Sequence, residues 1–178
     1  MSIADKLFSF QGRLRRRDWW LFVVLLWFAS AIVSGVAMAA MGVSLMSLLP
    51  MGAAGAGAAV SGAATKVFEV QCVVFLLLLW PGAALGVKRL HDRGKTPWLL
   101  AVFYVVEIAQ QAISFITLQS GGNPMTSPTM LRALVSLMLV VVGIWVLIEL
   151  GFLEGTMGPN KYGPSPKGFG AEEVGFTT

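Results

Sequence analysis

The chain has 178 residues, of which 56% are hydrophobic and only 12% are charged, about half the charged share of a typical soluble domain. Its apolar residues gather into stretches about as long as a bilayer is thick, which excludes an ordinary soluble domain and predicts an all-α membrane protein. The formal charge of +4 arises largely from basic residues beside these stretches, where they orient membrane spans, so we expect no nucleic-acid binding.

The chain begins with a basic segment, residues 1–18. Residues 7–20 read LFSFQGRLRRRDWW and combine apolar side chains, an arginine cluster and two tryptophans. This composition suits the interface between water and lipid. We predict that the segment lies on the membrane surface and leads into the first membrane span.

Four hydrophobic stretches follow, each close to the roughly 20 residues that an α-helix needs to cross the hydrocarbon layer. We predict a bundle of four transmembrane helices within residues 19–152, at residues 19–41, 67–87, 97–118 and 131–152. Residues 42–66 form a Gly/Ala tract that either extends the second helix outward or forms an outer loop. Residues 153–178 are rich in Gly and Pro and predict a largely irregular tail.

The orientation follows from the distribution of cations. All of the 13 Lys and Arg residues except Lys66 and Arg132 lie in the N-terminal segment, in the loop after the second span or in the tail. Loops rich in Lys and Arg stay in the cytoplasm. We therefore predict that both termini are cytoplasmic.

Several polar residues lie inside the predicted spans. Glu107, Gln111 and Ser114 share one face of the third span, which we expect to point into the bundle because an ionisable group facing lipid costs several kcal/mol. This polar face either joins the helices by hydrogen bonds or lines the path of a small transporter or channel centred on Glu107. The candidate intramembrane cluster also contains an expected ion pair between Glu69 and Arg132, and its members are Glu69, Glu107, Gln110, Gln111, Ser114 and Arg132.

The loop after the second span reads VKRLHDRGKTPW and holds the one histidine of the sequence. His91 beside Asp92 suggests, as an alternative, an enzyme that modifies lipid headgroups by proton transfer. The sequence offers no strong nucleophile nearby and no second histidine or carboxylate cluster. We therefore predict no catalytic residue, no cofactor and no metal site.

Three strings, FSFQGRLRRRDWW, KRLHDRGKTPW and GPNKYGPSP, occur in this order along the chain. In these strings the sequence resembles the bacterial inner-membrane family catalogued as domain of unknown function 805, over nearly its whole length. The resemblance implies a small multi-span protein of the bacterial cytoplasmic membrane with no established activity. It also implies a structured tail, and we expect Asn160 and Tyr162 to fold back and hydrogen-bond with Arg89, His91 or Asp92.

The three strings together predict a layer at the cytoplasmic side of the membrane. Its cations suit anionic phospholipid, each contributing about 1 kcal/mol of attraction near the surface. We expect a non-enzymatic protein that binds anionic lipid or a membrane partner through this layer, as an accessory subunit, a homo-oligomer or part of a larger complex. The candidate residues of the layer are Arg13, Arg16, Arg89, His91, Asp92, Arg93, Asn160 and Tyr162.

Overall fold

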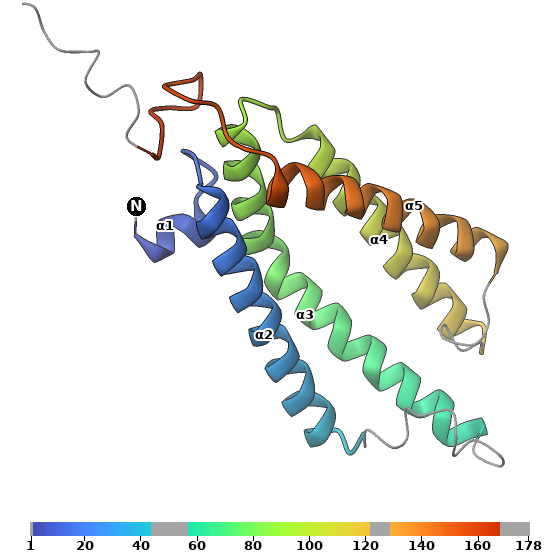
Figure 1. Cartoon of the computed structure of the whole chain (residues 1–178). Coiled ribbons are helices and arrows are strands. Elements are labelled where there is room, and N and C mark those ends of the chain that lie inside the picture. Colours follow the sequence, from blue (N-terminus) through green and yellow to red (C-terminus); the bar gives the residue numbers. More distant parts are fainter. Residues whose placement is uncertain (1, 44–56, 122–128, 168–178) are drawn as a thin grey trace, which may run out of the picture. The chain divides into compact units, whose positions relative to one another are not determined.

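The computed structural model describes residues 2–43, 57–121 and 129–167, and the side chains from residue 62 onward in the second of these ranges. The described chain is helical (Figure 1). Its elements are α1 (Ile3–Phe8), α2 (Arg16–Ala40), α3 (Gly57–Asp92), α4 (Trp98–Gln119), α5 (Met130–Leu147) and the π-helical turn η3 (Ile148–Phe152) that continues α5.

Four of these helices are long and apolar enough to cross a membrane. They overlap the four predicted spans, so this part of the prediction is confirmed, whereas their orientation stays a prediction. The prediction of a loop from residue 88 onward is partly wrong, because α3 continues to Asp92 and residues 88–92 are helical. The helix α3 begins at Gly57, so the second half of the Gly/Ala tract extends that helix, and residues 44–56 lie outside the described residues. Pro81 lies within α3, where it removes one backbone hydrogen bond of the helix.

The chain divides into two compact units, which we describe separately. Unit 1 contains residues 1–26, 79–105 and 140–178, and therefore all three motif strings. Unit 2 contains residues 27–78 and 106–139, and therefore the whole intramembrane cluster. This division places the basic motif strings and the predicted intramembrane cluster in different units.

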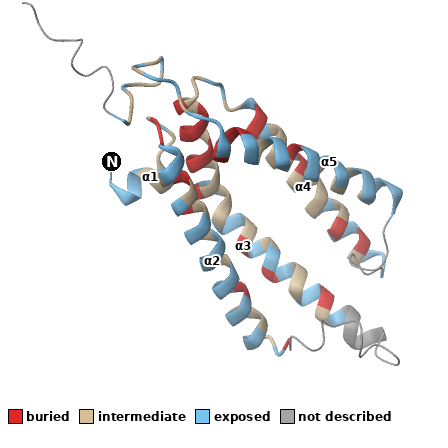
Figure 2. Cartoon of the chain, viewed as in Figure 1, coloured by how far each residue is buried: buried red, intermediate tan, exposed pale blue. Residues whose placement is uncertain are grey.

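Unit 1 has an apolar core at the end of α3, where buried positions concentrate (Figure 2). The core consists of Leu14, Trp19, Phe22, Leu85, Leu90, Leu100 and Leu150. Gly86 permits α4 to pack closely on α3, because a Cβ atom at this position would lie 2.8 Å from a methyl group of Leu100. Small residues thus bring these helices together, as is common in membrane bundles.

The N-terminal segment only partly follows the prediction of a surface-lying segment. The short helix α1 exposes the apolar side chains of Ile3 and Phe8, as expected at an interface. Leu14, however, is 1% exposed and belongs to the core, and its backbone N–H donates to the carbonyl of Lys88. The segment therefore crosses the end of α3 as an integral part of unit 1.

Candidate functional site

The C-terminal end of α5, which continues as η3, is capped by side chains from other segments. The last carbonyls of a helix lack partners within the helix and carry the negative end of its dipole, so cationic donors stabilise them. Here the five successive carbonyls of residues 149–153 accept hydrogen bonds from side chains. Arg93 donates to Glu149 (3.2 Å), and Arg89 donates to both Leu150 (2.9 Å) and Leu153 (2.5 Å). Trp20 donates to Gly151 (2.9 Å), and Arg16 donates to Phe152 (3.0 Å). The arginines of two motif strings therefore hold the end of α5.

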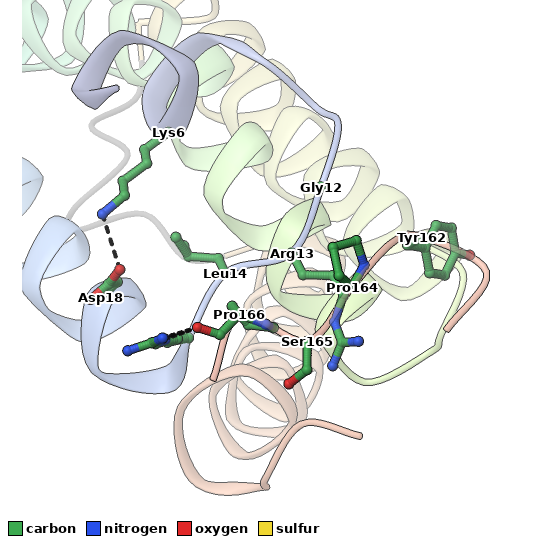
Figure 3. Close-up of a pocket in the computed structure, with 10 residues that line it drawn as sticks. Lys6, Gly12, Arg13, Leu14, Asp18, Tyr162, Pro164, Ser165 and Pro166 are labelled. Atoms are coloured by element: carbon green, nitrogen blue, oxygen red, sulfur yellow. Dashed lines mark hydrogen bonds and ion pairs between the residues drawn. The ribbon is translucent and has the colours of Figure 1, made fainter. Parts of the chain in front are cut away.

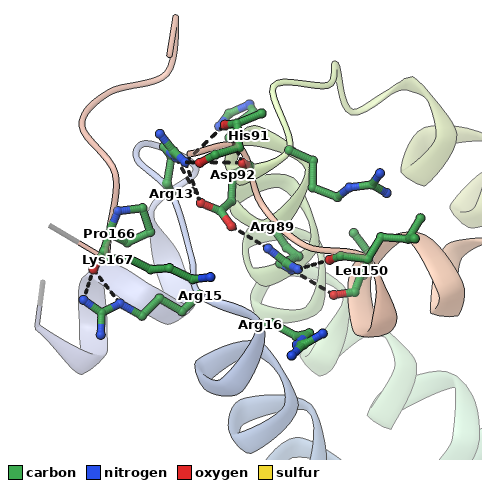
Figure 4. A network of polar contacts seen from close by, with 12 residues as sticks. Arg13, Arg15, Arg16, Arg89, His91, Asp92, Leu150, Pro166 and Lys167 are labelled. Carbon is green, nitrogen blue, oxygen red and sulfur yellow. Dashed lines mark hydrogen bonds and ion pairs between the residues drawn. The ribbon is translucent and has the colours of Figure 1, made fainter. Parts of the chain in front are cut away.

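Asp92 lies at the centre of this network, between two arginines (Figure 4). Arg13 Nε donates to one carboxylate oxygen at 3.0 Å, and Arg89 Nη1 donates to the other at 2.5 Å. Arg13, Arg89 and Asp92 are only 5%, 1% and 3% exposed. Removing one member of such a buried group leaves an uncompensated charge, so the three side chains depend on one another.

The tail docks on this group. Asn160 Nδ2 donates to the carbonyl of His91 at 3.0 Å, and the Tyr162 ring stacks on the His91 ring with centroids 3.8 Å apart. Thr156 N–H donates to the carbonyl of Asp92 at 2.8 Å. The prediction that the tail folds back onto His91 and Asp92 is confirmed, although Tyr162 makes a ring contact rather than the expected hydrogen bond.

Arg13 ties the tail to the N-terminal segment. Its guanidinium donates to the carbonyls of Thr156 at 2.6 Å and Gly158 at 2.7 Å, in addition to Asp92. We call the three segments joined in this way, residues 12–17, 88–95 and 153–167, the basic layer. All three belong to unit 1, and each contains one of the motif strings or part of it.

Two further cations of the basic layer have partners inside the protein. Lys88 is fully buried, and its ammonium donates to the carbonyls of Asp5, at 2.6 Å, and of Lys6 in α1. Lys95 pairs with Glu149 at 2.6 Å, and Arg93 contacts the same carboxylate. Burial lowers the pKa of the Arg93 guanidinium below its ordinary value. The Glu149 carboxylate therefore has two cationic partners from the basic layer.

The predicted residues of the layer differ in burial, and Arg15 and Arg17, two other arginines of the N-terminal segment, were not predicted. Arg13, Arg89 and Asp92 are brought together, but as internal supports whose polar atoms are directed at protein partners. Arg16 and Arg17, at the start of α2, are exposed, as are Arg15 just before this helix and Lys95, Lys161 and Lys167. These exposed cations can meet a ligand outside the protein.

Two cavities border Arg15. The larger, of about 420 Å³, lies between the N-terminal segment and the tail, with the Lys6–Asp18 ion pair (3.0 Å) on one side and Tyr162 on the other (Figure 3). The smaller, of about 200 Å³, is bordered by the cations Arg15, Arg16, Arg17, Arg89 and Lys167 and by the carboxylates Asp92 and Glu154. Arg15 Nε donates to the carbonyl of Pro166 at 2.5 Å, so the tail forms part of the wall of both cavities.

The intramembrane cluster is only partly assembled in unit 2. Gln110 Nε2 on α4 donates to Ser136 Oγ on α5 at 3.0 Å, and Ser114 donates to the Gln110 carbonyl at 2.9 Å. The expected ion pair between Glu69 and Arg132 is wrong, because the described side chains form no such pair and Glu69 is exposed. The prediction rested on the similar depth of the two residues in the membrane, and depth does not determine which side chains of neighbouring helices face each other.

Glu107 and Gln111, the remaining members of the cluster, are half-buried. Gln110 of this cluster forms a hydrogen bond between two helices. Its partner Ser136 was not predicted, because in the sequence it is merely a polar residue within a span. Among the described residues, no group of three or more His, Cys, Asp or Glu side chains is placed to hold a metal ion.

Comparison with known proteins relates the chain to bacterial proteins. The family described as "Protein of unknown function (DUF805)" matches residues 7–164, from α1 through the docked tail. Two relatives, both named "Uncharacterized protein YiiR", from Escherichia coli strains K12 and O157:H7, are each 34% identical over 168 residues, which covers 92% of this chain and 89% of the relative. No solved structure matches the chain. The chain belongs to the DUF805 family.

Proposed function

We propose that this protein is a non-enzymatic, multi-span protein of the bacterial cytoplasmic membrane that binds anionic phospholipid through the exposed cations of its basic layer. The observation that carries the proposal is the separation of the cations into two groups. Arg13, Lys88 and Arg89 are buried against protein acceptors, whereas Arg15, Arg16 and Arg17 are exposed at the start of a membrane-length helix.

The position of these arginines suits a lipid headgroup. A helix long enough to cross a bilayer begins at Arg16, so its first turn lies close to the depth of the headgroups. Basic residues just outside a span attract the anionic lipids of the cytoplasmic leaflet, with about 1 kcal/mol for each cation. The predicted orientation, with both termini in the cytoplasm, directs the three arginines to that leaflet.

The alternative of a headgroup-modifying enzyme is less consistent with the geometry. The Asp92 carboxylate is 3% exposed and accepts hydrogen bonds from two arginines. The His91 ring is stacked on Tyr162. Both side chains are engaged with protein partners, whereas general acid–base catalysis requires a group that can exchange a proton with the substrate.

The test is native mass spectrometry of the protein released from mild detergent in the presence of phosphatidylglycerol and phosphatidylcholine. The wild-type protein should retain phosphatidylglycerol in preference to phosphatidylcholine. Changing Arg15, Arg16 and Arg17 to Gln should weaken this retention about a hundredfold, the combined effect of three cations. The control Lys66→Gln removes a cation from unit 2 and should retain the lipid. Equal retention of both lipids, or a bound protein in place of lipid, would contradict the proposal.

A further inference from the structure

The smaller cavity beside α2 has a strongly positive lining. Five cations and two carboxylates border it, and one of those carboxylates, Asp92, is already paired with Arg13 and Arg89. The other, Glu154, is exposed. The positive charges of Arg16, Arg17 and Lys167 at the cavity are therefore only partly neutralised by acidic side chains.

The start of α2 adds to this positive charge. The N-terminal end of a helix carries the positive end of its dipole, which disfavours cations there. This helix nevertheless begins with Arg16 and Arg17, directly after Arg15. Arg16 is partly compensated by the carbonyl of Phe152, but the guanidinium of Arg17 has no hydrogen bond or ion pair with any residue in the described part of the chain. An anion at this position would relieve the repulsion.

The tail supplies the remaining cation from the opposite side. Pro166 is held by Arg15, and this contact brings the next residue, Lys167, to the cavity. In Figure 4 the side chains of Arg16, Arg89 and Lys167 reach the same region of the network. Arg15 is bonded to the tail, and one nitrogen of Arg16 donates to the Phe152 carbonyl. The donors that remain for a ligand are therefore those of Arg17 and Lys167 and the other N–H groups of Arg16.

The size of the cavity limits what it can hold. Its volume of about 200 Å³ is below the range of about 300–1,000 Å³ that is typical of sites for drug-sized molecules. A single phosphate group is small and tetrahedral, and its oxygens match the planar donors of arginine. The volume and the lining thus favour a phosphate group over a larger metabolite.

We propose that the cavity bordered by Arg16, Arg17 and Lys167 is a binding site for one phosphate group, supplied either by a lipid headgroup or by free phosphate. If the source is lipid, the inference rests on the proposed function and assigns the headgroup to this cavity. If the source is free phosphate, the site is independent of lipid binding.

The most specific test of the cavity compares substitutions of two lysines in the tail. Lys167 borders the cavity, whereas Lys161 is exposed and lies over the Tyr162 ring, outside the cavity. Lys167→Gln and Lys161→Gln remove the same charge from the same segment. Isothermal titration in neutral detergent would measure binding of inorganic phosphate, and native mass spectrometry would measure retention of phosphatidic acid and phosphatidylglycerol.

The site predicts that Lys167→Gln and Arg17→Gln each weaken binding about fivefold, while Lys161→Gln leaves it unchanged. If the wild-type protein binds inorganic phosphate saturably, free phosphate is a sufficient ligand of the cavity. If it binds no inorganic phosphate, and Lys167→Gln and Arg17→Gln retain less anionic lipid, the ligand is a lipid headgroup. If Lys161→Gln and Lys167→Gln reduce lipid retention equally, the cavity is not the binding site, although the proposed function of lipid binding still holds. Binding of neither phosphate nor anionic lipid to the wild-type protein would overturn both.

Discussion

Arg13 donates to Asp92 across 79 residues of sequence, and both side chains are almost fully buried. The contact joins the N-terminal segment to the end of α3, and Arg13 then reaches the tail carbonyls of Thr156 and Gly158. One arginine thus holds together the three segments in which the motif strings occur. The centre of the basic layer is therefore buried and supports the fold, whereas its exposed cations lie at its edge.

Asp92→Asn should destabilise the protein strongly. The change leaves the buried guanidiniums of Arg13 and Arg89 without their negative partner, which we expect to lower the free energy of unfolding by about 3 kcal/mol. Thermal unfolding in mild detergent measures the effect. Glu154→Gln is the matched control, since this carboxylate is exposed, and it should change stability by less than about 0.5 kcal/mol. Similar melting curves for the two variants would show that the buried pair is not important for stability.

Gly155→Ala should weaken docking of the tail. A Cβ atom at this position would overlap the Asp92 carboxylate, so either the tail or the carboxylate must move. Forced overpacking of this kind typically costs about 1–3 kcal/mol of unfolding free energy. Gly35→Ala in α2 is the control, because a Cβ atom there has no neighbour within 4 Å among the described residues. A Gly155→Ala protein as stable as the control would mean that the tail is not held against Asp92.

Tyr162→Leu should increase the fraction of time that the tail is detached from His91. The ring stack on His91 contributes about 0.5–1.5 kcal/mol beyond apolar burial, so its loss should raise the rate of trypsin cleavage after Lys161 about two- to tenfold. Tyr162→Phe keeps the aromatic ring and should be cleaved at nearly the wild-type rate. Equal protection of the Leu and wild-type proteins would exclude a contribution of the stack to docking.

Ser136→Ala should cause a small loss of stability in unit 2. It removes the hydrogen bond from Gln110 that joins α4 to α5, and such bonds within membranes contribute about 0.6 kcal/mol on average. Ser30→Ala is a suitable control, because the Ser30 hydroxyl donates to Trp27 of its own helix. Unfolding free energies that fall equally in the two variants would argue against a role for the Gln110–Ser136 bond in helix packing.

The sequence predicts the spans well because membrane insertion depends on hydrophobicity summed over about 20 residues, and neighbouring residues cannot change that sum greatly. It cannot separate Arg13 from Arg15. Both are arginines in the same short basic run, yet Arg13 is buried against Asp92 and Arg15 is exposed, a difference that depends on where the chain crosses α3.

Long-range partners account for the other differences. Trp20 reads as an interfacial aromatic residue, but its indole N–H donates to Gly151 at the end of α5. The expected Glu69–Arg132 pair failed because depth in the membrane does not determine helix rotation. The docked tail was predictable only through the family resemblance, since a Gly/Pro-rich segment on its own indicates an irregular coil.

The exposed arginines of the basic layer are proposed to bind anionic lipid, whereas the buried arginines support the fold. Native mass spectrometry with phosphatidylglycerol tests this proposal most directly on two variants, Arg17→Gln and Arg13→Gln, each compared at equal folded fraction. Arg17→Gln should lose lipid about fivefold without a change in melting temperature, and Arg13→Gln should melt earlier while its folded fraction retains lipid. Unchanged lipid retention by Arg17→Gln, or lipid loss confined to Arg13→Gln, would contradict the account.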